Sequence, residues 1–214
     1  MISIKQFTFN PFAENTYILW DEPTKEAIII DPGCLEDEEK DDLRDFITNQ
    51  KLQPVLLINT HTHLDHIFGN RFVFDTWGLA PWIHREDQMV LDRAQQMAYY
   101  YGISMEASPG PAGYLQEGEV IRFGASEMQI IFTPGHCPGE ICLYSPKHKI
   151  LIAGDLLFDG SIGRTDLPGG DYDTLITSIK EKLWPLDDDV RVYCGHGPDT
   201  TIGKERRTNP FLVD

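Results

Sequence analysis

Four short β-prone runs in this sequence each lead directly into histidine or aspartate, and this repeated arrangement constrains the fold more than any other feature. The runs cover residues 55–59, 128–132, 149–153 and 190–193. Each run is followed at once by glycine, threonine, proline or a cluster of polar residues, as is typical of strand ends. Strands of one sheet that end at the same edge would bring these side chains together, so the sequence predicts a preorganised site on rigid elements.

The remainder of the chain indicates a mixed α/β protein. Further β-like segments cover residues 2–9, 17–20 and 27–30, and the turn signal Asp31-Pro-Gly33 closes the last of them. Apolar residues at helical spacing predict three helices. One helix contains the acidic run 36–45, and the others cover residues 85–101 and 173–182. No linker, low-complexity tract or repeat marks a boundary, so we expect residues 1–214 to form a single domain.

The charge balance restricts the possible partners. Acidic residues outnumber basic ones by 34 to 18, which gives a formal net charge of −16. Such a chain lacks the electrostatic footprint for polyanions, so we expect neither nucleic acid nor a membrane surface as a partner. The apolar runs are shorter than the roughly 20 residues that span a bilayer. The four cysteines form no Cys-x-x-Cys pair and no signal-peptide pattern is visible, so a cytoplasmic location is predicted.

The segment His61-Thr-His-Leu-Asp-His66 has the pattern of a metal site. His61 and His63 are separated by one residue and can both reach one ion, while Asp65 and His66 project elsewhere and can serve a second ion. Five of the seven histidines lie in this segment or directly after a β-run and a turn. One such histidine alone would more often be structural. Their joint placement with aspartates favours a zinc or iron site, for which imidazole and carboxylate are suitable ligands.

Four motifs follow one another along the chain: Thr60-His-Thr-His-Leu-Asp-His66, Thr133-Pro-Gly-His136, Ala153-Gly-Asp155 and Gly195-His196. With these motifs the sequence resembles the metallo-β-lactamase fold superfamily, and specifically its glyoxalase II-like (hydroxyacylglutathione hydrolase-like) branch of the short, single-domain type. The resemblance implies a four-layer αβ/βα sandwich with two metal ions. It implies a first metal held by His61, His63 and His136, a second held by Asp65, His66 and His196, and Asp155 bridging both.

The same resemblance implies a dinuclear metallohydrolase. Its expected substrate is a small acyl-thiol, such as S-2-hydroxyacylglutathione, attacked by a metal-bridging hydroxide, with Asp65 and Asp155 as the carboxylates of the catalytic centre. Metal coordination can lower the pKa of water from about 15.7 to about 7. A thiolate leaving group needs little protonation, so the reaction requires no dedicated general acid. Zinc is the expected metal, with iron or manganese as alternatives, and the oligomeric state is left open.

Two other activities stay open at this stage, and one is disfavoured. A persulfide dioxygenase would use one iron at His61, His63 and Asp155, with His136 as a ligand or neighbour. A lactonase-type hydrolase would use the dinuclear ligand set. A carboxylate at Asp155 is unlike β-lactamases, which place other residues there, so antibiotic hydrolysis is disfavoured.

Two further features bear on the substrate. Residues 160–170 are similar to a family loop in which a basic residue, matching Arg164, meets a carboxylate of glutathione; pairing of Arg164 with Asp166 is the alternative. Few residues follow His196, so we expect no C-terminal glutathione-binding helical domain, which argues against efficient use of lactoylglutathione. Asp31 is a candidate partner for a ligand histidine, with turn capping as the alternative.

Overall fold

The chain divides into two compact units, each built from strands and helices. A computed structural model describes residues 1–213. Unit 1 comprises Met1–Leu115 with Arg122–Glu127, and unit 2 comprises Gln116–Ile121 with the chain from Met128 onward. The expected α/β class is confirmed. Compact units are not by themselves separate domains, so the expectation of a single domain stays a prediction.

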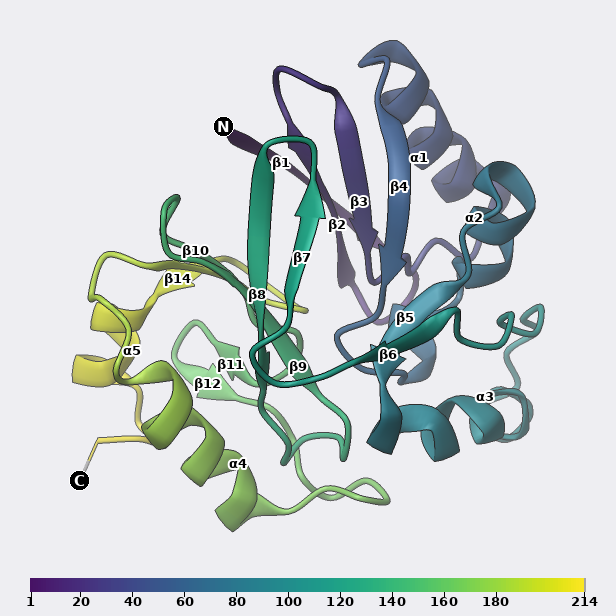
Figure 1. Cartoon of the computed structure of the whole chain (residues 1–214). Helices are drawn as coiled ribbons and strands as arrows, with labels where there is room; N and C mark the ends of the chain where they lie inside the picture. Colours follow the sequence, from purple (N-terminus) through teal and green to yellow (C-terminus); the bar gives the residue numbers. More distant parts are fainter. Residues whose placement is uncertain (214) are drawn as a thin grey trace. The chain divides into compact units, whose positions relative to one another are not determined.

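Unit 1 contains a six-stranded sheet in the order β1-β2-β3-β4-β5-β6 (Figure 1). Its strands are β1 (Ile2–Phe9), β2 (Glu14–Asp21), β3 (Glu26–Ile30), β4 (Gln53–Ile58), β5 (Pro81–His84) and β6 (Gly113–Leu115). The first three strands pair antiparallel, and β3 through β6 pair parallel. Parallel neighbours need long crossover connections, which usually contain a helix. Here these are α1 (Asp37–Asn49), α2 (Asn70–Trp77) and α3 (Gln88–Tyr100).

Apolar side chains of the helices cover one face of this sheet. Leu43 and Ile47 of α1 and Val73 of α2 belong to one buried cluster with Ile29 of β3 and Leu57 of β4. The i, i+4 spacing of the two α1 residues places them on the same side of the helix. The acidic side chains of α1 remain outside this cluster and crowd its first turn, where negative charge favours the helix dipole.

Unit 2 is organised around a second six-stranded sheet in the order β14-β13-β10-β9-β8-β7. Its strands are β7 (Val120–Phe123), β8 (Ser126–Phe132), β9 (Ile141–Ser145), β10 (Ile150–Ile152), β13 (Arg191–Tyr193) and β14 (Thr200–Thr201). The tip of the β7–β8 hairpin is grouped with unit 1. A small antiparallel pair is formed by β11 (Leu157–Phe158) and β12 (Ser161–Ile162).

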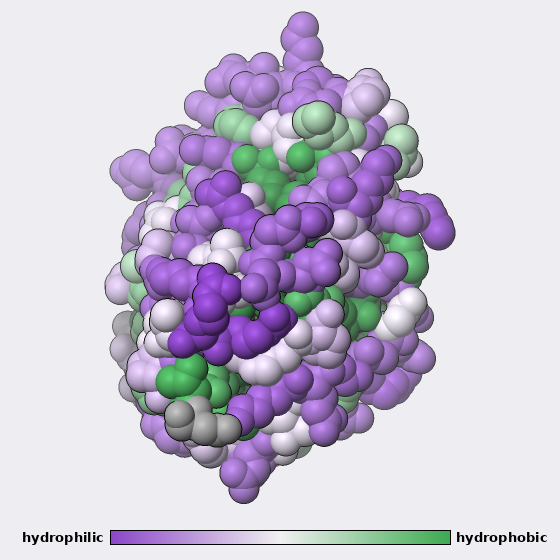
Figure 2. All heavy atoms as spheres, turned by 90° about the vertical axis from the view of Figure 1, so that its left-hand side faces the viewer, coloured by the Kyte–Doolittle hydropathy of each residue, from purple (hydrophilic) through white to green (hydrophobic). Residues whose placement is uncertain are grey.

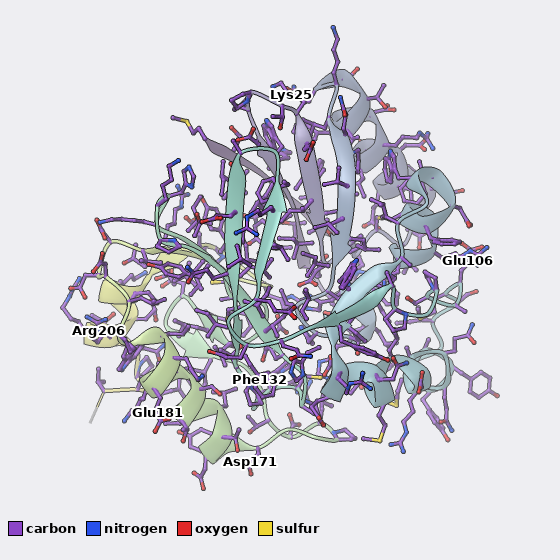
Figure 3. All side chains as sticks on the ribbon, in the orientation of Figure 1. Lys25, Glu106, Phe132, Asp171, Glu181 and Arg206 are labelled. Carbon is purple, nitrogen blue, oxygen red and sulfur yellow. The ribbon has the colours of Figure 1, made fainter. Side chains whose placement is uncertain are left out.

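Two helices complete unit 2. The helix α4 (Tyr172–Ser178) begins after Asp171, whose side chain accepts a hydrogen bond from Thr174 N, and continues as a π turn over Ile179–Leu183 (Figure 3). The helix α5 (Ile202–Thr208) carries Arg206, whose guanidinium contacts Asp188. The predicted helix over residues 173–182 is therefore present, but its second half is not α-helical.

The surface seen in Figure 2 is mostly hydrophilic, with small separate hydrophobic areas. Such a surface agrees with the formal charge of −16. Within residues 1–213, no helix has the length and apolar character required to cross a membrane.

Candidate metal centre

The histidine-rich segment of unit 1 lies directly after β4, where the chain turns into a short 3₁₀ helix over Leu64–His66. The ring centroid of His61 lies 4.8 Å from that of His63 and 4.1 Å from that of His66. Asp65 Oδ2 lies 3.8 Å from His66 Nε2. His61 and His66 are buried, whereas His63 and Asp65 are half-buried. The structure therefore brings together all four site residues predicted in this motif.

Asp31 supports this segment from the end of β3. Its Oδ1 accepts a hydrogen bond from Thr60 N at 2.7 Å, and its Oδ2 accepts one from Thr60 Oγ1 at 2.6 Å. Oδ2 also lies 3.1 Å from His66 Nδ1. A carboxylate at Nδ1 orients the ring and leaves Nε2 for a metal ion. Asp31 is thus the partner of a predicted ligand histidine, as the sequence suggested.

The residue between His61 and His63 has its own buried carboxylate partner. Thr62 donates from N and from Oγ1 to Asp87 Oδ2, at 2.6 and 3.1 Å. Asp87 is fully buried at the end of the short 3₁₀ turn Arg85–Asp87. Asp87 carries no recognisable signal of this role in the sequence, because an acid near the start of a helix is ordinarily only a helix-start signal.

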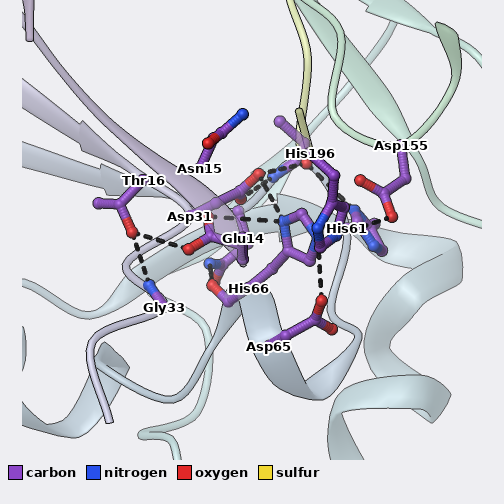
Figure 4. A network of polar contacts seen from close by, with 12 residues as sticks. Glu14, Asn15, Thr16, Asp31, Gly33, His61, Asp65, His66, Asp155 and His196 are labelled. Atoms are coloured by element: carbon purple, nitrogen blue, oxygen red, sulfur yellow. Dashed lines mark hydrogen bonds and ion pairs between the residues drawn. The ribbon is translucent and has the colours of Figure 1, made fainter. Parts of the chain in front are cut away.

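Further buried polar groups, which the sequence did not indicate, lie next to His66 (Figure 4). Glu14 Oε2 accepts a hydrogen bond from Thr16 Oγ1 at 2.9 Å, and Thr16 Oγ1 accepts one from Gly33 N at 2.9 Å. Glu14 Oε1 lies 3.9 Å from His66 Nδ1. Burial raises the pKa of Glu14 well above its usual value, and the neighbouring Asp31 carboxylate acts in the same direction.

Glycine is required at position 33 because the backbone approaches its neighbours closely. A Cβ atom there would clash with Glu14 Oε2 and would lie 2.5 Å from the Asp65 carbonyl oxygen. Asn10 donates from Nδ2 to the carbonyls of Gly33 and Asp65, both at 3.0 Å. The Asp31-Pro-Gly33 turn and the histidine-rich segment are therefore packed and bonded to each other.

In unit 2, three strand ends carry the other predicted ligands. Asp155 Oδ2 lies 3.6 Å from His136 Nε2 and 3.4 Å from His196 Nε2. The strands β10 and β13 are parallel, with Ile152 opposite Tyr193, so the chain leaves both strands at the same edge. β8 is antiparallel to β9, which is antiparallel to β10, so β8 ends at that edge as well.

The prediction of a shared sheet edge is thus correct for three of the four runs and wrong for the fourth. The run over residues 55–59 forms β4, which belongs to the other sheet. Its parallel partners are β3 and β5, because the chain crosses over through α1 and α2. Periodicity and strand propensity contain no information on which runs share a sheet.

Glycines surround the Asp155 segment. A Cβ atom at Gly195 would clash with Asp155 Oδ1, and one at Gly163 would clash with the Asp155 carbonyl oxygen. The next residue, Arg164, presents its own carbonyl oxygen to His136 Nδ1 at 2.8 Å. This contact holds the imidazole so that Nε2 faces Asp155.

The side chain of Arg164 forms the local ion pair that the sequence offered as the alternative. Its Nε and Nη2 atoms donate to Asp166 Oδ1 and Oδ2, at 2.7 and 2.8 Å. Both side chains are largely exposed, at 60% and 67%. The hydrogen bonds from Arg164 lower the pKa of Asp166 to about 2. A role for Arg164 in substrate binding stays a prediction.

The donor atoms present in each unit fit a divalent metal ion. In unit 1, His61, His63, Asp65 and His66 gather imidazole and carboxylate donors within one short segment. In unit 2, two imidazole nitrogens approach one carboxylate oxygen. Nitrogen and oxygen donors of this kind suit zinc, iron and manganese.

Comparison with known proteins identifies the family. The model of the Metallo-beta-lactamase superfamily matches residues 9–196. The chain belongs to the metallo-β-lactamase superfamily. This membership confirms the expected fold and establishes a hydrolase class that binds divalent metal ions.

Several relatives are similar to this chain over nearly their whole length. Hydroxyacylglutathione hydrolase GloC of Haemophilus influenzae is 38% identical over 213 residues, which cover 99% of this chain and 98% of that protein. The crystal structure of BLEG-1 B3 metallo-beta-lactamase has a TM-score of 0.90 and 36% identity, covering 99% of this chain and 100% of that one. TTHA1623 in a di-iron-bound form has a TM-score of 0.86 and 36% identity, covering 97% and 100%.

Proposed function

We propose that this protein is a dinuclear metal-dependent thioesterase of the glyoxalase II-like kind, acting on a small acyl-thiol such as S-2-hydroxyacylglutathione. The observation that carries the proposal is the complete set of seven predicted ligands, with Asp155 Oδ2 close to the Nε2 atoms of two histidines. The 38% identity to GloC supports hydroxyacylglutathione as the substrate class.

The proposal assigns the ligands as the family resemblance implies. The first metal would be held by His61, His63 and His136, the second by Asp65, His66 and His196, and Asp155 would serve both. Contacts within each unit support this assignment. Asp31 lies at Nδ1 of His66 and the Arg164 carbonyl lies at Nδ1 of His136, so both rings keep Nε2 for an ion.

When bound, divalent ions supply Lewis acidity, which acidifies water and polarises a thioester carbonyl. The protein contributes the arrangement of its own groups. Asp65 and Asp155 bring negative charge next to the imidazoles of His66, His136 and His196. Asp31 and Asp87 hold the segment that carries the other histidines through hydrogen bonds to Thr60 and Thr62. A thiolate leaves without protonation, which agrees with a site that needs no further acid.

Arg164 is the proposed contact for a substrate carboxylate. For this the guanidinium would exchange Asp166 for the substrate, since its Nε and Nη2 edge now binds that side chain. The exchange is inexpensive because an exposed ion pair contributes about 0–1 kcal/mol. The observed pair therefore does not preclude the proposed contact.

Zinc is the proposed metal, and two similar structures justify alternatives in the test. TTHA1623 is described in a di-iron-bound form, which favours including iron and, with it, the persulfide dioxygenase reaction. BLEG-1 is described as a B3 metallo-beta-lactamase, which favours including a β-lactam substrate. A lactone is the third alternative substrate in the test, because a lactonase-type hydrolase would use the same ligands. The four cysteines are all buried free thiols, which supports the proposal of a reducing, cytoplasmic location.

The decisive experiment is metal analysis of the purified protein combined with an activity panel. Protein loaded separately with zinc, iron or manganese would be assayed on an S-acylglutathione, glutathione persulfide with oxygen, a lactone and a β-lactam. We expect two metal ions per chain and thioester hydrolysis as the fastest reaction. Fewer than one metal ion per chain after loading, or no thioester hydrolysis with any metal, would overturn the proposal.

A further inference from the structure

Glu140 is a buried carboxylic acid that the proposed chemistry does not use. It directly precedes β9 and has no exposed surface. Burying such a group is costly unless it is hydrogen-bonded. Glu140 Oε1 accepts a hydrogen bond from Asp155 N at 2.7 Å. The carboxylate therefore binds the main chain of a predicted metal ligand.

The main chain of the same residue contacts the segment that carries a second ligand. The carbonyl oxygen of Glu140 accepts hydrogen bonds from Thr133 N at 2.9 Å and from Thr133 Oγ1 at 3.4 Å. Thr133 lies at the end of β8, three residues before His136. Glu140 N lies 3.4 Å from the carbonyl oxygen of Cys137, the residue after His136. One residue thus joins the His136 loop to the Asp155 loop.

We propose that Glu140 is a positioning residue that fixes the separation of Asp155 and His136, and so sets the metal affinity of unit 2. The inference rests on the proposed assignment of these two residues as metal ligands. The distance to be held is the 3.6 Å between Asp155 Oδ2 and His136 Nε2. Leaving a buried amide without its acceptor is costly, so the hydrogen bond from Asp155 N to the Glu140 side chain fixes this part of the backbone.

The surroundings of Asp155 add to the effect of this bond. Gly163 and Gly195 pack so closely against Asp155 that a Cβ atom at either position would clash with it. Gly163 therefore packs against the Asp155 main chain and Gly195 against its carboxylate, while Glu140 accepts a hydrogen bond from the Asp155 N–H. A side chain at position 140 that cannot reach Asp155 N would leave this amide without its acceptor, and a new position of Asp155 would alter the ligand geometry.

Two variants separate the reach of the side chain from its charge. Glu140→Gln keeps the length and an acceptor oxygen, whereas Glu140→Asp keeps the charge but is one methylene too short. The matched control is Glu205→Asp, because Glu205 is also a fully buried carboxylate of unit 2 that accepts a backbone hydrogen bond, from Gly160 N at 2.9 Å. The partners of Glu205, which include Thr200 and Asn209, are not predicted ligands.

Metal affinity would be measured on metal-free full-length protein by titration with Zn²⁺ against a competing chelator, and Co²⁺ spectra would report the ligand geometry. We expect Glu140→Asp to weaken Zn²⁺ binding by roughly 10–100-fold, as for other partners that orient ligands. We expect the Zn²⁺ affinity of Glu140→Gln to stay within about threefold of that of the wild type, because glutamine keeps an acceptor oxygen for Asp155 N. Glu205→Asp should lower the melting temperature without changing the metal affinity.

Three results would overturn the inference: equal affinity of Glu140→Asp and wild type, equal losses in Glu140→Asp and Glu140→Gln, or an equal loss in Glu205→Asp. If Glu140→Asp does not fold, amide hydrogen exchange of metal-free wild type and Glu140→Gln decides. Protection of the Asp155 amide in both supports the bond, and rapid exchange in either contradicts it. Metal binding without thioester hydrolysis would overturn the proposed function and leave the result on Glu140 standing.

Discussion

The two units present their predicted ligands in opposite ways. In unit 1, four predicted ligands come from a single stretch of six residues, His61 to His66, after one strand. In unit 2, His136, Asp155 and His196 come from three strand ends far apart in the sequence. Local clustering places donors in one loop but does not orient them, so unit 1 surrounds that loop with buried carboxylates. Strand register already aligns the donors of unit 2, where glycines and one buried carboxylate complete the arrangement.

The largest expected effect comes from removing one ligand of each unit. We expect Asp155→Asn and His63→Ala each to lower kcat/KM by at least about 100-fold, because each substitution removes a predicted metal ligand. Thermal unfolding of the metal-free proteins should change little, since neither side chain belongs to the apolar core. Full activity in one variant would show that the substituted residue is not a ligand, and would contradict the proposed role of that unit in metal binding.

The next effect tests whether unit 1 depends on its supporting carboxylates. Asp31→Ala removes the acceptor of Thr60 N and the partner of His66 Nδ1. Zn²⁺ affinity should fall by about 10–100-fold. Asp75→Ala is a suitable control, because Asp75 pairs with Arg71 at an exposed position. The Zn²⁺ affinities would be measured by chelator competition. Equal affinities of the two variants would show that the segment 61–66 does not need Asp31 to orient its side chains.

Unit 2 should respond instead to a small increase in volume at a glycine. Gly195→Ala places a methyl group against Asp155 Oδ1 and the Gly154 backbone. We expect a loss of about 1–3 kcal/mol in the free energy of unfolding, typical of overpacking, and weaker metal binding. Gly110→Ala is the control, since a Cβ atom there has no neighbour within 4 Å. Denaturant titration of both variants measures the difference, and identical curves would refute the close packing around Asp155.

The smallest effect compares two aspartates, one from each unit, whose pKa is lowered to about 2. Burial alone would raise the pKa of Asp21, but hydrogen bonds from Ser126 and Thr24 outweigh it. The folded pKa lies below the unfolded value, so the stabilisation is present above about pH 4 and is lost as the pH falls towards 2. Asp166 is exposed and pairs with Arg164.

Urea unfolding between pH 2.5 and 7 would check this contrast. The stability difference between wild type and Asp21→Asn should be about 1–2 kcal/mol at pH 7 and should shrink below about pH 4. Asp166→Asn should show almost no difference at any pH, because exposed pairs contribute little. A pH-independent difference for Asp21→Asn would mean that its hydrogen bonds do not favour the ionised form.

Much of the secondary structure could be predicted because its signals are local. The segment 2–9 is strand β1, and the acidic run begins helix α1. The helix α5 was missed, although Thr201 caps it by accepting a hydrogen bond from Lys204 N, and this cap was a usable signal. The helix α2 begins without any side-chain cap, so the sequence offered no comparable sign of its start.

The sequence alone determined the identity of the predicted ligands and the family, because metal ligation selects residue types whose spacing in short motifs can be recognised. Tertiary structure decided which strand ends are neighbours and which buried groups support the ligands. Asp87 contacts Thr62 across 25 positions, and Glu140 contacts Asp155 across 15. A carboxylate in the sequence looks the same whether water or a buried amide will be its partner. Whether a carboxylate is solvated or accepts a hydrogen bond from a buried amide is determined only when the chain folds and buries it.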